Sequence, residues 1–165
     1  MTIPVHHVNA SDARFMREMI VLLRKGVRDG VLADEMASDH SGDPQLRLLA
    51  QKSSGSAARQ INAMVSCLDD WNAETRPRGL RARIETPVEA PPSATAEPTD
   101  YGDELADLHG ALFDARVTQN LLVHHRAVIA RSRQEMIEGL NTRSRAFARD
   151  AISQHSGDLR LLEAG

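Results

Sequence analysis

Histidine is the residue type whose placement in this sequence could support chemistry. His124 and His125 are adjacent, and His155 follows later in the chain with Asp158 three positions beyond it. Imidazole nitrogens are good ligands for copper, zinc, iron and nickel, and a carboxylate can complete such a ligand set. A buried imidazole can also act as an acid or a base near neutral pH when a carboxylate lies nearby. These four residues are therefore the candidate site.

Helices must position these side chains, because the residues around them repeat with helical spacing. His125 and His155 each have apolar residues one turn before and one turn after, so both are predicted to face a helix-packed core. Adjacent helical residues point about 100° apart, which places His124 at the edge of the same stripe. Bundle cores commonly hold metal ions, so the spacing predicts a metal site formed by His124, His125, His155 and Asp158.

Two other interpretations of the histidines stay open. A histidine on an apolar helix face is often a hydrogen-bonded structural residue instead of a ligand. An enzyme could use a buried histidine as an acid or a base, but no motif identifies a substrate. The sequence contains neither the Glu-x-x-His pattern of di-iron bundles nor the His-Glu-x-x-His pattern of zinc proteases. A non-enzymatic role is therefore favoured over an enzymatic one.

Four long helices are expected around this site. Gly26 and Gly30 either weaken the first helix or let a neighbouring helix approach it closely. Capping residues and prolines set the expected ends of the helices. The first helix is predicted over about 12–36, with Ser11 as its N-cap, and the second from 44 to before Pro77, with Asp43 as its N-cap. The third helix is predicted to begin between 103 and 110 and to end at about 138. The fourth helix is predicted to follow Asn141 as its N-cap.

The two halves of the chain resemble each other, each reading as long helix, turn, long helix. The first helix pair is predicted over 11–72 and the second over 102–163. Five of the seven prolines fall in the segment between them, 73–101, which reads as an extended linker. Neither pair could bury its apolar stripe alone. We therefore predict an all-α fold, a single four-helix bundle over 1–165 built from two helix-hairpin repeats.

Composition narrows the function classes. Aromatic residues make up only 3% of the chain, which suits helix-on-helix packing better than a β-sandwich. The formal net charge of −3 argues against a nucleic-acid binder. The single cysteine, Cys67, excludes an intrachain disulfide and a CxxC motif. No run is apolar enough to span a membrane, and no signal peptide is visible, so the chain as written is expected to be cytoplasmic, although a mature secreted chain would look the same.

Arginines cluster on both sides of the expected turn between the last two helices. Glu135 and Glu138 are interleaved with them, so a solvated surface of ion pairs is expected here in preference to an anion site. The arginines are Arg131, Arg133, Arg143, Arg145 and Arg149.

The order of these motifs resembles the "domain of unknown function 305" family of small helical proteins. In the first half, Phe15, Met19-Ile20, Leu49-Ala50, Gln60-Ile61 and Met64 fall in register with the family pattern. The second half carries the pattern Phe113-Asp114, His124-His125, Glu138-Gly139-x-Asn141, Phe147-Ala148, Ile152 and His155-x2-Asp158-Leu159. The resemblance covers nearly the whole chain apart from the linker.

This resemblance implies a ferritin-like four-helix bundle of two diverged units in tandem. Some members of the family bind copper in the periplasm or cell envelope through the His-His pair and nearby methionines, and many are secreted. Only His124 and His125 match that motif here. Leu22-Leu23 replace the pair in the first unit, and Asp29 and Arg131 stand where each unit would carry methionine. Loss of soft thioether ligands weakens a site for Cu(I).

We therefore expect a metal-binding bundle with one degenerate and one partly retained site. The cofactor would be copper or another transition metal, or none if the bundle has become a structural or interaction protein. No nucleic acid and no membrane span are expected, a homodimer stays open, and no small-molecule partner is identified.

Overall fold

A computed structural model of the chain describes residues 7–40, 43–75 and 101–164. In these ranges the secondary structure is helical, as predicted for an all-α fold. The helices are α1 (Ala10–His40), α2 (Pro44–Thr75), α3 (Tyr101–Ala106), α4 (Ala111–Glu138) and α5 (Thr142–Ala164).

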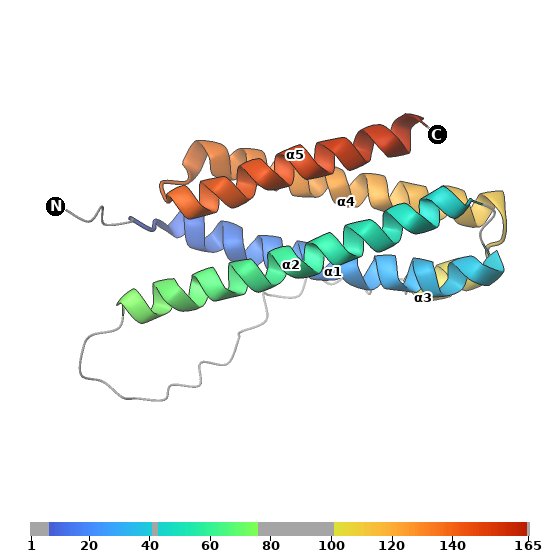
Figure 1. The fold of residues 1–165 in the computed structure, drawn as a ribbon, viewed down its shortest axis with the longest axis horizontal. Helices are drawn as coiled ribbons and strands as arrows, with labels where there is room; N and C mark the ends of the chain where they lie inside the picture. The colour runs from blue at the N-terminus through green and yellow to red at the C-terminus, as the bar shows by residue number, and fades with distance from the viewer. Residues whose placement is uncertain (1–6, 41–42, 76–100, 165) are drawn as a thin grey trace.

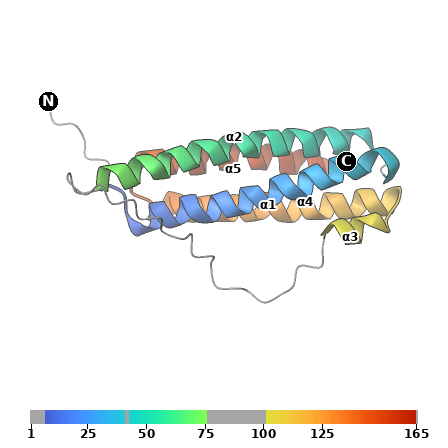
Figure 2. The ribbon, with the colours of Figure 1, turned by 90° about the horizontal axis from the view of Figure 1, so that it is seen from below.

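The four long helices form a bundle of two hairpins. Helices α1 and α2 pack along each other, as do α4 and α5, and α1 joins the two hairpins by packing on α4 (Figures 1 and 2). The short helix α3 lies against α1. This arrangement gives the predicted four-helix bundle, with α3 as an additional element.

The break between α3 and α4 was not predicted from the sequence. The third long helix was expected to begin between 103 and 110, but it begins at Ala111 after a turn. Gly110 has a φ of 56°, a left-handed conformation that glycine adopts without the penalty of a Cβ. Its N–H donates to the carbonyl of His40 at 2.6 Å, and the Nδ1 atom of His40 lies 2.7 Å from the carbonyl oxygen of Leu108. These contacts tie the end of α1 to the turn.

Two of the three predicted N-caps are confirmed. Asp43 Oδ1 accepts from the N–H of Gln45 at 2.8 Å, and Asn141 Oδ1 accepts from the N–H of Arg143 at 2.9 Å. The prediction for Ser11 was wrong, because α1 begins at Ala10, two residues before the predicted start, and Ser11 lies inside the helix. Asn9 caps it instead: Asn9 Oδ1 accepts from the N–H of Asp12, and Asp12 Oδ2 accepts from the N–H of Asn9, in a reciprocal capping box.

The predicted linker, 73–101, lies mostly outside the described residues, which stop at 75 and resume at 101. Its first three residues belong to α2 and its last one opens α3.

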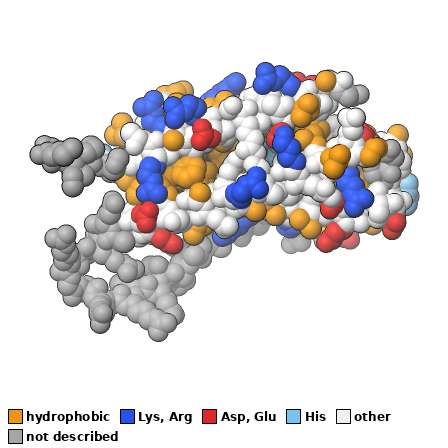
Figure 3. All heavy atoms as spheres, viewed as in Figure 1, with side chains coloured by type: hydrophobic (Ala, Val, Ile, Leu, Met, Phe, Trp, Pro, Cys, Tyr) orange, Lys and Arg blue, Asp and Glu red, His pale blue; other side chains and the backbone are white. Residues whose placement is uncertain are grey.

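The core is built mainly from aliphatic side chains and methionines, with a few aromatic residues among them. One cluster joins the first half of α1 and the second half of α4 to α2 and α5, and it contains Phe15, Met19, Leu23, Met64, Trp71 and Val128. A second cluster near the other end of α1 contains Leu46, Leu105, Phe113, Val117 and Leu121. Basic and acidic side chains are interspersed on the face seen in Figure 3. No helix in the described ranges is long and apolar enough to cross a membrane.

Candidate functional site

The three predicted histidines come together between α4 and α5. His125 is fully buried, His155 is 2% exposed, and His124 at the edge of the stripe is 8% exposed. The ring centroids of His125 and His155 lie 4.9 Å apart. The ring centroid of His124 lies 5.5 Å from that of His125 and 5.7 Å from that of His155. The inward orientation inferred from helical spacing is therefore correct. We call these three residues the histidine cluster.

His125 and His155 form a direct hydrogen bond. Their Nδ1 atoms lie 2.7 Å apart, so one ring must donate its Nδ1 hydrogen and the other must accept it. The Nε2 atoms of both rings are buried and have no hydrogen-bond partner within the described part of the chain. One of these nitrogens carries a hydrogen and the other a lone pair, because each neutral ring has one N–H. Each unpartnered buried polar atom costs stability and calls for an explanation.

Burial keeps the histidine cluster neutral. Removal from water, together with the neighbouring imidazoles, lowers the pKa of His124 to about 4 and that of His155 to about 3. The pKa of His125 is also lowered by burial, although the negative charge of Asp158 opposes this. Neutral imidazole is the form that binds metal ions, so protons would not compete for these nitrogens at pH 7.

Asp158 joins the histidine cluster from the next turn of α5. Its carboxylate is buried, and its Oδ1 atom accepts from the ammonium of Lys52 on α2 at 3.2 Å. Its Oδ2 atom is buried without a hydrogen-bond partner among the described residues. The structure therefore brings the four predicted site residues into one region.

Their present arrangement does not form a preformed metal site. The described residues contain no group of three His, Cys, Asp or Glu side chains that could hold a metal ion. One reason is geometric: nitrogens bound to one tetrahedral zinc lie roughly 3.3 Å apart, given Zn–N distances of about 2.0–2.1 Å. The 2.7 Å between His125 and His155 is too short for both Nδ1 atoms to bind one ion. The donor types fit a transition metal, but the rings would have to turn.

Gly26 of α1 makes room for His124. A Cβ at position 26 would collide with the His124 ring, approaching its Nε2 atom to 2.6 Å. Gly26 therefore lets the neighbouring helix approach α1 closely, which is one of the two roles considered from the sequence. Gly30 does the same one turn later, where a Cβ would meet the hydroxyl of Ser54.

A second buried polar cluster was missed by sequence reasoning. Glu135 was assigned to a solvated ion-pair surface, and that assignment was wrong because the side chain is fully buried. The hydroxyl of Ser144 lies 2.6 Å from Glu135 Oε1 and 2.6 Å from Asp12 Oδ1. A hydroxyl has one hydrogen to donate, so one of the two carboxyl groups must itself carry a proton.

Glu135 binds a proton more readily than Asp12 in this carboxyl cluster. Burial raises its pKa to about 7, and the proximity of Asp12 adds to the rise. For Asp12, burial would raise the pKa, but hydrogen bonds from Asn9, Ser144 and Asn141 outweigh it and lower the pKa. When Glu135 carries a proton it donates to Ser144, and the Ser144 hydroxyl then donates to the Asp12 carboxylate. In the sequence, Asp12 lies at the start of one expected helix and Glu135 near the end of another. Helical spacing alone does not predict that these two residues meet.

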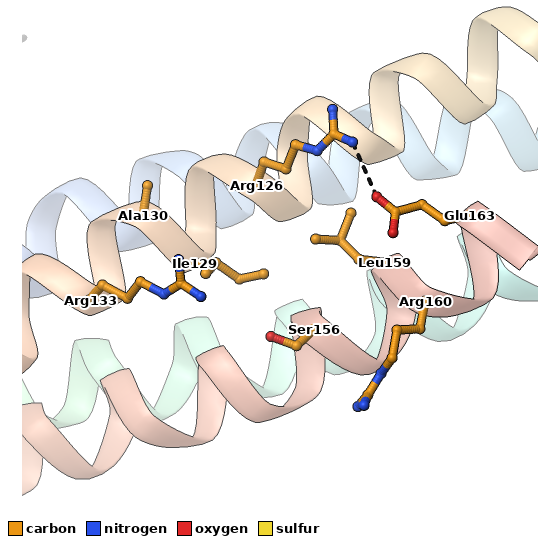
Figure 4. Close-up of a pocket in the computed structure, with 8 residues that line it drawn as sticks. All are labelled: Arg126, Ile129, Ala130, Arg133, Ser156, Leu159, Arg160 and Glu163. Carbon is orange, nitrogen blue, oxygen red and sulfur yellow. Dashed lines mark hydrogen bonds and ion pairs between the residues drawn. The ribbon is translucent and has the colours of Figure 1, made fainter.

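A surface groove of about 430 Å³ runs between α4 and α5. Ile129 and Leu159 form its apolar part, and Arg126 pairs with Glu163 at 3.1 Å across it (Figure 4). Arg160 points away from the groove in the same view. The residues described as lining it include no member of the histidine cluster, so the groove gives the buried rings no open contact with a substrate.

Comparison with known proteins places the chain in a family. The profile of the "Domain of unknown function (DUF305)" family matches residues 9–164. A DUF305 crystal structure from Streptomyces coelicolor, of a protein described as a candidate secreted protein, superposes with a TM-score of 0.68 at 22% identity, covering 92% of this chain and 88% of that one. A DUF305 fragment from Deinococcus radiodurans gives a TM-score of 0.72 at 18% identity, covering 95% of both chains.

At these identities the two structures establish the fold alone. No curated protein matches the chain significantly. The family match extends over nearly all of the sequence and includes both hairpins and the histidine cluster. The chain therefore belongs to the DUF305 family, helical proteins defined by a domain of unknown function.

Proposed function

We propose that the protein binds a transition-metal ion at the histidine cluster. The observation that carries this proposal is the convergence of three buried imidazoles in which two Nε2 atoms have no hydrogen-bond partner among the described residues. A bound ion would satisfy the lone pair that one of these two nitrogens holds buried and unpaired. Their neutral state supports the same role, because no proton needs to be displaced at pH 7.

Binding requires a local rearrangement of the rings. The hydrogen bond between His125 and His155 must open, so that one nitrogen of each ring turns toward the ion. His124, His125 and His155 would then supply nitrogen ligands, and Asp158 would supply an oxygen. Nitrogen with carboxylate oxygen suits Cu(II) or Zn(II) better than Cu(I), which prefers thioether and thiolate sulfur. The bound ion would hold α4 against α5.

The proposal also explains an asymmetry between the hairpins. We take α1–α2 and α4–α5 as diverged copies of one unit, in which Leu22-Leu23 correspond to His124-His125. Leu23 is fully buried in the aliphatic core, where His125 in the other hairpin faces His155. The first unit thus uses its position for packing, and only the second retains a candidate site.

Calorimetric titration of the demetallated protein with Cu(II) and Zn(II) tests the proposal. We expect one equivalent to bind in the wild type and binding to be lost in the double variant His124→Gln/His125→Gln. His6→Ala/His7→Ala is the control, because the N-terminal pair could bind metal without the cluster. An ion at 100 times its Kd should stabilise the fold by about 2.7 kcal/mol in the wild type and in the control. Equal binding by the wild type and the cluster variant would refute the site.

A second candidate function is a bundle that has lost its metal and acts without one. The 2.7 Å hydrogen bond favours it, because that bond partners one nitrogen of each ring without any ion. This alternative predicts that neither ion shifts the melting temperature. It also predicts that the cluster variant loses stability only as expected for a damaged core, by about 1–3 kcal/mol.

A further inference from the structure

Helices α2 and α5 meet through polar side chains. These two helices approach each other less closely than the partners within either hairpin. Gln154 connects them by donating to Ser56 Oγ at 2.6 Å and accepting from Gln60 Nε2 at 2.7 Å. Lys52 and Asp158 form the next connection along this seam. Side-chain contacts of this kind can open one at a time while the apolar contacts of the hairpins stay intact.

Lys52 and Asp158 differ sharply in exposure. The Lys52 side chain is 64% exposed, whereas that of Asp158 is 3% exposed. The ammonium therefore covers the buried carboxylate from the solvent side of the seam. A lysine on a flexible stem can return its ammonium to water, whereas the aspartate cannot leave its buried position. Asp158 also has a second oxygen, Oδ2, that is buried and has no hydrogen-bond partner in the described ranges.

We propose that Lys52 is a removable counter-ion that regulates metal access to Asp158. This inference rests on the proposed metal site at the histidine cluster. In the metal-free protein the ammonium neutralises the carboxylate and closes the seam between α2 and α5 beside His155. An incoming cation competes with the ammonium for the same carboxylate, and Lys52 swings into solvent as Asp158 becomes a ligand. The lysine thus sets both the route and the affinity for the ion.

The test compares Lys52→Met with the wild type by titration with Zn(II) and by stopped-flow mixing. We expect Lys52→Met to bind Zn(II) about fivefold more tightly, because the ammonium no longer competes with the ion for the Asp158 carboxylate. Its metal-free melting temperature should fall, because the buried carboxylate loses its partner, and Zn(II) should restore it. Arg143→Met is the matched control: Arg143 pairs with Asp70 between the same two helices at 3.1 Å, and its loss should leave Zn(II) affinity unchanged.

Asp158→Asn completes a double-mutant cycle. If Lys52 acts through Asp158, the variants Asp158→Asn and Lys52→Met/Asp158→Asn bind Zn(II) equally. Equal affinity of the wild type and Lys52→Met overturns the regulatory role of Lys52, while histidine-dependent binding would still uphold the metal site. Absence of binding in both proteins overturns the metal site and the inference together. Binding by Lys52→Met alone would support the inference, with the wild type held closed.

Discussion

The Nδ1 atoms of His125 and His155 face each other at 2.7 Å in the buried interior of the bundle. One hydrogen lies between them, and a second proton on either ring would place a positive charge in a buried site. Burial therefore keeps both rings neutral. This relationship decides how the metal-free protein responds to acid.

Acid should destabilise the metal-free protein at pH values where isolated histidines begin to charge. The pKa of His124 falls to about 4 and that of His155 to about 3, below the ordinary value of 6.5. The unfolded chain therefore takes up protons first, so stability is lost as pH falls from about 6.5 toward 4. Urea unfolding at pH 7, 6 and 5 measures the loss, and imidazole ¹⁵N shifts in the folded protein should show these two rings neutral at pH 5.5. Rings that titrate near pH 6.5 would refute the assignment.

Glu135 should produce the opposite trend at higher pH. Its pKa is raised to about 7 from an ordinary 4.5, so the folded state holds a proton that the unfolded state has lost. Its contribution to stability is complete below about pH 4.5 and is lost as pH rises through 7. The free energy of unfolding of the neutral variant Glu135→Gln, taken relative to that of the wild type, should rise by on the order of 2–3 kcal/mol between pH 5 and pH 8. Urea unfolding measures this difference. A constant difference across that range would contradict a protonated Glu135.

Asp12 should be one of the most sensitive positions in the chain. Its Oδ1 atom accepts from the N–H groups of Leu140 and Asn141 at 3.1 and 3.0 Å, and its Oδ2 atom helps cap α1. It therefore holds the start of α1 to the turn between α4 and α5. Asp12→Asn replaces one acceptor oxygen by an NH2 donor and removes the negative charge at a buried position, which should cost roughly 2–4 kcal/mol at pH 7.

Asp34→Asn is the control for that measurement. Asp34 also accepts from two side chains, Arg47 and Gln51, but at the surface. Its replacement should cost less than about 1 kcal/mol. Similar losses for the two variants in urea unfolding would show that burial of Asp12 contributes little.

Helical spacing predicted most of the fold and the orientation of the histidines. A stripe recurring every three or four residues reveals the buried face of a helix without knowledge of its partner. This is why His125 and His155 could be placed in the core and why the caps at Asp43 and Asn141 were found. Local signals overlap at helix starts, however. Ser11 and Asn9 are both good N-caps, and the hydrogen bonds to Asp12 selected Asn9.

Contacts between distant segments could not be predicted from spacing. Glu135 looked like a surface residue because arginines surround it in sequence, yet Ser144 and Asp12 meet it in the core. The link between Lys52 and Asp158 likewise depends on how α2 packs across α5. The 2.7 Å contact between His125 and His155 is also a result of packing. Because of this contact the histidines are a cluster of possible ligands and not a preformed metal site.

Gly26 offers a direct test of the space around His124. Alanine in a helix is ordinarily more stable than glycine by about 1 kcal/mol, but a Cβ at 26 would strike the His124 ring. Gly26→Ala should therefore destabilise the fold by about 1–3 kcal/mol and weaken Zn(II) binding, because the ring must move. Gly55→Ala on α2 is the matched control, because a Cβ at position 55 meets nothing within 4 Å. This substitution should stabilise the fold by about 1 kcal/mol. If both alanine variants are stabilised equally in urea unfolding, α1 does not hold the His124 ring in place, and the ring is free to turn.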